Sequence, residues 1–265
     1  MPMEDKIYSI AFLLTYMAII WLIVSIAWSK RPKKRTPAWN WSFGSFVLLA
    51  FGDFFHLVPR TYLWYLFDIK GQTDVYTTDL GIILYGFGLI MTSITVTLFY
   101  FGMYMFWRHT YATNEDIKEY SNGDLKLQYL DIIAITSVLF RLCLIAYPMN
   151  AWGSEPDFYG GWFSFRYLTN IPLYIIGIEV IVLFLRGASK GERQEAVNSA
   201  TNQVVKQSAI WIIISYVCYS ITVFGVQAEP LLGMFMIPKT IAYLIILYLF
   251  YKNYWLVKNE QHSTN

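Results

Sequence analysis

Charged residues are scarce in this chain of 265 residues: Asp, Glu, Lys and Arg make up 14% of it, against roughly 25% in soluble domains. The formal net charge is only +2, so the chain lacks the strongly basic character that a nucleic-acid partner would favour. Cysteine and histidine are also rare, with two and three residues, and no Cys-x-x-Cys or His-Glu-x-x-His motif occurs. These absences argue against a disulfide framework, a common zinc site and an ordinary soluble enzyme.

Hydrophobic residues make up 56% of the chain, and they gather in long runs. A helix that spans a bilayer needs about 20 mainly apolar residues. The runs lack the two-residue alternation of membrane strands, and no internal repeat divides the chain. We therefore expect an all-α fold, with residues 1–265 forming a single transmembrane domain. Seven runs are long enough to span a bilayer: residues 7–28, 38–59, 80–107, 127–148, 167–185, 209–226 and 231–251.

The lysines and arginines predict the orientation of the bundle. With the N-terminus outside, fourteen of them fall in the inner loops and tail, and four fall in the outer loops. Positive charge is enriched in cytoplasmic loops of membrane proteins. We therefore expect the N-terminus outside and the C-terminus inside, in an integral membrane protein of the plasma membrane.

Tryptophan is concentrated near the predicted ends of the spans. Trp39, Trp107 and Trp255 fall near the inner boundary, and Trp64 and Trp152 fall near the outer one. The indole ring favours the membrane–water interface because it is apolar but carries one N–H group. This distribution predicts an aromatic belt at each interface.

Four ionisable side chains lie inside the predicted spans: Asp53, Arg141, Glu179 and Lys239. Such groups are costly in hydrocarbon, and they usually mark a functional site or a paired structural feature. At 1.5 Å per residue, three of them lie roughly 9–12 Å from the outer ends of their helices, and Glu179 lies roughly 18 Å from its own. We expect one charge-balanced polar cavity, with Glu179 toward its floor.

The second span carries Asp53, His56 and Arg60 at spacings that place them on one helical face. An Asp and a His one turn apart can share a proton, with the carboxylate fixing the imidazole tautomer. The predicted catalytic residues are therefore Asp53, His56 and Glu179. The alternative is a polar stripe that packs against Arg141 or Lys239 and only holds helices together.

Further polar residues extend the predicted site. Thr92 and Thr95 share a face of the third span, and we assign them to substrate binding together with Arg60, Arg141 and Lys239. The alternative for the threonines is that their hydroxyls bond back to their own helix.

Pro238 lies directly before Lys239 in the last span, and we expect the proline to open the backbone there. A lysine in the last of seven helices could also form a retinal Schiff base, but Lys239 is predicted in the outer half rather than at the centre. The residues point to no cofactor and no metal.

Gly52-Asp53 in a membrane helix, followed by a helix that opens with Tyr85-Gly86-Phe87-Gly88, resembles two blocks of the lysoplasmalogenase-like membrane family. The resemblance implies a multi-helix hydrolase that cleaves the vinyl ether bond of lysoplasmalogens, with Asp53 as an acid. Thr92-Ser93-Ile94 stands where that family carries a histidine, and the family has eight spans rather than seven. His56 would then act as a local substitute for that histidine.

Two classes of function follow from these residues. As an enzyme, the protein would be a lipid-ether hydrolase that acts on lysolipids, with Asp53 and His56 performing proton chemistry. As a binding protein, it would be a seven-helix small-ligand sensor, receptor or transporter that uses the same cavity without catalysis. In both cases the expected partner is a membrane lipid or a small amphiphile. The sequence does not specify an oligomeric state.

Overall fold

The computed structural model describes residues 3–66, 70, 78–112, 127–150, 152, 165–194, 197–225 and 228–256. Within these residues seven helices are long and apolar enough to cross a membrane, and no strand occurs. The expected all-α, seven-helix architecture is confirmed, and the chain is an integral membrane protein. The helices are α1 (Met3–Ser29), α2 (Pro37–Trp64), α3 (Asp79–Tyr111), α5 (Leu127–Ala146), α6 (Phe165–Gln194), α7 (Ser199–Gly225) and α8 (Met236–Phe250). Shorter segments are the 3-10 helices Pro148–Asn150 and Pro230–Phe235 and a π-helical turn, Tyr251–Trp255.

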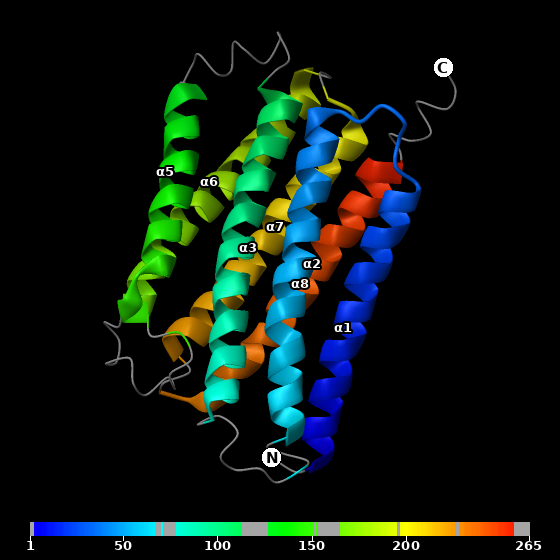
Figure 1. Ribbon diagram of the computed structural model, residues 1–265. Coiled ribbons are helices and arrows are strands. Elements are labelled where there is room, and N and C mark those ends of the chain that lie inside the picture. Colours follow the sequence, from blue (N-terminus) through cyan, green and yellow to red (C-terminus); the bar gives the residue numbers. More distant parts are fainter. Residues whose placement is uncertain are drawn as a thin grey trace.

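Figure 1 shows the helices running alternately up and down in one bundle, with α1 and α5 at opposite edges. We call the end at which α1 begins the amino-terminal end, and the end at which α8 finishes the carboxy-terminal end. The outward orientation of the amino-terminal end stays a prediction from the loop charges.

Two helix boundaries differ from the expectation. The polar segment between the fifth and sixth spans is largely helical, because α6 continues to Gln194 and α7 begins at Ser199. The last span starts as the 3-10 helix Pro230–Phe235, so Pro238 lies in the first turn of α8. A proline is tolerated there because the first N–H groups of a helix have no intrahelical acceptor. Pro238 therefore marks the start of α8 and does not open its interior.

Close backbone contact joins α2 to α3. A Cβ atom added at Gly52 would overlap the Thr95 hydroxyl, and one added at Gly88 would lie 3.0 Å from the Phe55 carbonyl oxygen and 3.1 Å from the His56 Cα. Small residues at helix interfaces let the backbones of membrane helices approach closely. This contact fixes the part of α2 that carries the polar residues against α3.

Aromatic side chains fill the core at the carboxy-terminal end. Trp39, Trp107 and Trp255 are buried there inside the bundle, and their predicted level at the membrane boundary stays a prediction. The Trp255 indole stacks at a tilt on Phe250, with ring centroids 6.1 Å apart, and its Nε1 donates a hydrogen bond to the Ser42 hydroxyl at 3.0 Å. Because the indole N–H has found an acceptor inside the bundle, Trp255 does not need the water of the interface.

Candidate functional site

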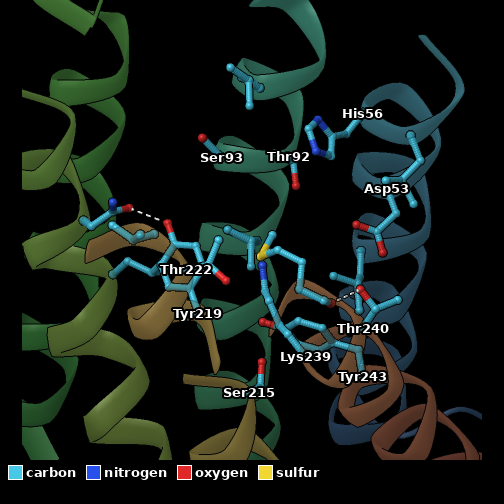
Figure 2. Close-up of a pocket in the computed structure, with 18 of the residues that line it drawn as sticks. Asp53, His56, Thr92, Ser93, Ser215, Tyr219, Thr222, Lys239, Thr240 and Tyr243 are labelled. Atoms are coloured by element: carbon cyan, nitrogen blue, oxygen red, sulfur yellow. Dashed lines mark hydrogen bonds between the residues drawn. The ribbon is translucent and has the colours of Figure 1, made fainter. Parts of the chain in front are cut away.

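A cavity of about 430 Å³ lies in the half of the bundle toward the amino-terminal end. All seven long helices line it: the later turns of α2 and α7, the middle turns of α3, the earlier turns of α6 and α8, two positions on α1 and one on α5. Figure 2 shows polar side chains from α2, α3, α7 and α8 around this space. The polar cavity expected in this half of the bundle is present.

Six of the eight residues that the sequence assigned to the site line the cavity: Asp53, His56, Arg60, Thr92, Arg141 and Lys239. They come from α2, α3, α5 and α8, which are separated by long stretches of sequence. Glu179 and Thr95 do not line it. The bundle thus brings together most of the predicted residues. Because Glu179 is not among them, the cations of the cavity lining outnumber its carboxylates.

Asp53 is held by a tyrosine from α1. The Tyr16 hydroxyl donates a hydrogen bond to Asp53 Oδ2, and both side chains line the cavity. No hydrogen bond joins Asp53 to His56 in the part of the chain that the structure describes, so the expected Asp–His pair is not formed. Lys239 acts on the Asp53 carboxylate electrostatically, without a direct ion pair between them among the described residues.

His56 lies one turn beyond Asp53 on α2, against the backbone of α3. Its Nδ1 would be 3.4 Å from a Cβ atom at Gly88, which shows how closely α3 passes. The imidazole is within electrostatic reach of both Arg60 and Lys239. His56 therefore faces a space whose charges are mainly positive.

Lys239 extends from the first turn of α8 into the middle of the cavity (Figure 2). Its Nζ lies 4.6 Å from the centre of the Tyr219 ring and 5.9 Å from that of Tyr243. A cation over an aromatic face is attracted by the ring quadrupole. The Tyr243 hydroxyl shares a hydrogen bond of 3.0 Å with the Tyr100 hydroxyl, which fixes one of these two rings.

Arg141 is the most deeply buried charge of the cavity wall, with 2% of its surface exposed. Its Nη1 donates hydrogen bonds to the Thr169 carbonyl oxygen at 2.8 Å and to Asn170 Oδ1 at 3.2 Å. Asn170 Oδ1 also accepts a hydrogen bond of 2.9 Å from the Tyr219 hydroxyl. The Nε of Arg141 is buried and has no acceptor among the described residues.

Glu179 belongs to a different part of the bundle, and its expected place on the cavity floor is wrong. It acts electrostatically on Asp131 and Tyr104, which form a second polar cluster with Arg108 in the last turn of α3. In that cluster Arg108 Nε and the Tyr104 hydroxyl donate to Asp131 Oδ1 at 2.8 and 2.6 Å. Glu179 lies nine residues after Asn170 on α6, which is half a revolution around the helix at 100° per residue. It therefore faces away from the cavity that Asn170 lines.

Thr95 also lies outside the cavity. Its hydroxyl donates to the Met91 and Thr92 carbonyl oxygens at 2.8 and 3.3 Å, and its side chain packs on Gly52 at the α2–α3 contact. The assignment of Thr95 to substrate binding is therefore wrong, and the back-bonded alternative describes it. Thr92 does line the cavity, as expected.

Tyrosines make up most of the lining that the sequence did not single out. Tyr16, Tyr219 and Tyr243 contact Asp53, Lys239 or both, and Tyr100 and Tyr216 complete the wall. A tyrosine costs little free energy in a membrane helix and carries no charge, so a search for charged residues does not find it. The available signal was that tyrosines recur on α7 and α8 within one or two turns of Lys239 and Ser215.

Among the described residues, no group of three His, Cys, Asp or Glu side chains is arranged to hold a metal ion. Comparison with known protein families, curated proteins and solved structures gave no match. The likeness to lysoplasmalogenase-like proteins therefore rests on Gly52-Asp53 and Tyr85-Gly86-Phe87-Gly88 alone.

Proposed function

We propose that the protein binds a membrane amphiphile in this cavity and hydrolyses it, with Asp53 as the proton donor. The observation that carries the proposal is a carboxyl group on a membrane helix that lines a cavity of about 430 Å³ and is held by one hydrogen bond, from Tyr16. Ligand pockets in proteins have volumes of roughly 300–1,000 Å³. The cavity is large enough for a reacting head and the adjoining part of a tail.

The cavity lining combines apolar and polar groups, as an amphiphile requires. Leu13, Leu49 and Leu57 on α1 and α2 add apolar surface beside Tyr16 and Asp53. On α7 and α8, Ser215, Lys239 and Thr240 supply hydroxyl and ammonium groups. An alkyl chain gains free energy against the leucines, and a polar head finds hydrogen-bond partners on α7 and α8.

The resemblance to lysoplasmalogenase-like proteins supports a vinyl ether as the bond that is cleaved. Because Tyr16 donates to Asp53 Oδ2, Oδ1 is the oxygen left to carry the proton that moves to the vinyl carbon. Water then adds to the oxocarbenium carbon, and its proton returns to Asp53 or passes to His56. The hemiacetal separates into an aldehyde and an alcohol, so one water is consumed and no redox partner is needed.

A ligand-binding protein without catalysis is the second candidate. Two observations favour it: Asp53 and His56 are not hydrogen-bonded to each other in the described structure, and every long helix contributes to the cavity wall. A ligand held there would contact all seven helices, which suits a sensor, receptor or transporter.

Turnover of a lipid panel by the purified protein, followed by mass spectrometry, separates the two candidates. The panel contains lysolipids with vinyl ether, alkyl ether and ester bonds, and the variant is Asp53→Asn, which keeps an acceptor for Tyr16. Asp79→Asn is the matched control, because Asp79 is exposed in the first turn of α3. We expect the vinyl ether lipid to give an aldehyde with wild type and with Asp79→Asn, and not with Asp53→Asn. Binding without any Asp53-dependent product would favour the second candidate.

A further inference from the structure

The charges that line the cavity do not balance. Three cationic side chains, Arg60, Arg141 and Lys239, face it, and Asp53 is the one carboxylate among its described lining residues. The sequence suggested two acids against two bases, but Glu179 lies outside and Arg60 adds a further cation. Uncompensated charge is costly inside a membrane protein, so this excess needs a physical reason.

Lys239 and Arg141 are the centre of the excess. Arg141 repels the Lys239 ammonium electrostatically, and Asp53, the one carboxylate of the described lining, attracts it. In the described part of the chain, neither forms an ion pair with a carboxylate, since the ion pair found there joins Arg108 to Asp131. Lys239 has aromatic rings as its neighbours, and no described residue accepts a hydrogen bond from its ammonium group.

Tyr219 contacts Lys239 directly and is linked to Arg141 through Asn170. Its ring lies beneath the Lys239 ammonium, and its hydroxyl donates to the Asn170 oxygen that also accepts from Arg141. Asn170 thereby holds the Arg141 guanidinium near the Tyr219 hydroxyl, and the Lys239 ammonium lies over the Tyr219 ring. Figure 2 shows Lys239 beside Tyr219. The position of Lys239 in the first turn of α8 adds to the excess, because the start of a helix carries a partial positive charge.

We propose that the ligand of this cavity carries an anionic group, a carboxylate or a phosphate, that binds between Lys239 and Arg141. This rests on the proposed function only in taking the cavity as the place where the ligand binds. An arginine and a lysine together give a carboxylate or phosphate several charge-assisted hydrogen bonds. Arg60 lies seven residues after Asp53 on α2, roughly 10 Å nearer the amino-terminal end, and it adds to the positive potential that attracts an anion.

The ligand is anionic overall and not zwitterionic, so a vinyl ether substrate of the proposed hydrolase would carry an anionic head in place of choline or ethanolamine. A cationic headgroup would find one carboxylate among the described lining residues, Asp53, and three cations that repel it. The excess of positive charge therefore discriminates against a positively charged head as well as favouring a negative one. A single alkyl chain would pack against Leu13, Leu49 and Leu57, which line the cavity beside Tyr16 and Asp53.

Binding of four probes to the purified full chain in a non-ionic detergent tests this, by native mass spectrometry and by calorimetry. The probes are lysophosphatidic acid, lysophosphatidylcholine with the same chain, a fatty acid, and inorganic phosphate. We expect lysophosphatidic acid to bind at least tenfold more tightly than lysophosphatidylcholine. Inorganic phosphate that competes as well as the anionic amphiphiles would support the anion site with a soluble anion as its occupant. Equal affinity for the anionic and zwitterionic lipids would overturn the proposal.

Lys239→Gln is the variant, and Lys252→Gln is its matched control, because Lys252 lies near a tyrosine ring at 5.8 Å but at the other end of the same helical stretch. We expect Lys239→Gln to weaken lysophosphatidic acid binding at least tenfold and to leave lysophosphatidylcholine binding within twofold. Lys252→Gln should change neither. Unchanged binding of lysophosphatidic acid by Lys239→Gln would contradict the proposal.

Two readouts keep this proposal separate from the hydrolase. The preference for an anionic head in wild type is independent of the folding of any variant, and Asp53→Asn should keep that preference while losing turnover. Loss of turnover in Asp53→Asn with no anionic preference in wild type would leave the hydrolase standing and remove the anion site. A preference for anionic heads in wild type, without any turnover that depends on Asp53, would keep the anion site and remove the hydrolase.

Discussion

Replacing Glu179 with methionine should make the protein more stable. Glu179 is 9% exposed, and both of its carboxylate oxygens are buried without a hydrogen-bond partner among the described residues. Its neighbours on the buried face of α6 are Ile176, Val180 and Leu183, and the nearby Asp131 carries a charge of the same sign. Methionine has a similar length and no polar atom that requires a partner.

The expected gain follows from the two unsatisfied oxygens. A buried polar group without a partner costs about 1–3 kcal/mol, so Glu179→Met should raise the free energy of unfolding by about that amount. For a chain of this size each kcal/mol shifts Tm by roughly 2–4 °C, which gives an increase of roughly 2–12 °C. Ligand binding and turnover should stay unchanged, because Glu179 does not line the cavity.

Thermal unfolding in detergent, followed by tryptophan fluorescence, measures this effect. Asp131→Asn is the opposite control: it weakens the ion pair with Arg108 and the hydrogen bond from Tyr104, and it should lower Tm. A lower Tm for Glu179→Met than for wild type would refute the reasoning, since it would mean that the carboxylate has a stabilising partner. Loss of turnover at wild-type stability would return Glu179 to the catalytic residues.

Two further substitutions test the packing around the cavity. Gly52→Ala should lower the free energy of unfolding by about 1–3 kcal/mol, because the new methyl group overlaps the Thr95 hydroxyl. Adding Thr95→Ala should restore most of the loss in Tm, and a double variant no more stable than Gly52→Ala would contradict the contact. Asn170→Leu should destabilise the protein by about 2–5 kcal/mol, because Arg141 and Tyr219 lose the acceptor that they share. A Tm for Asn170→Leu within 2 °C of wild type, roughly 1 kcal/mol at most, would argue against this network.

The membrane spans could be predicted because a span is recognised from the composition of one continuous stretch of sequence. An apolar run long enough to cross a bilayer stands out wherever its neighbours lie, and each of the seven helices overlaps its predicted run. The boundaries near residue 194 and at residue 236 were missed for a local reason. The polar stretch after residue 187 can form helix outside the apolar core, and a 3-10 turn looks the same as α-helix in a hydropathy pattern.

The candidate site could be predicted only where a residue is charged. Asp53, Arg141 and Lys239 were found because a charge in hydrocarbon has a high free-energy cost. That cost does not show which face of a helix is turned toward the cavity. Glu179 was placed in the cavity by its depth alone, and half a revolution of α6 separates it from Asn170. Tyr16, which holds Asp53, was missed because it comes from a helix with no charge in its span to draw attention.

The glycine contact between α2 and α3 has a consequence for motion within the bundle. Since the Thr95 side chain packs directly on Gly52, and Gly88 packs directly on the α2 backbone at Phe55 and His56, α2 cannot slide or rotate against α3 without a clash. Asp53, His56 and Arg60 are therefore carried by a rigid pair of helices. Lys239, in contrast, lies in the first turn of α8, which follows directly on the 3-10 segment Pro230–Phe235, and the hydrogen bonds of a 3-10 helix have poorer geometry than those of an α-helix. We therefore expect the start of α8 to adjust more readily to a bound molecule than the wall formed by α2 and α3.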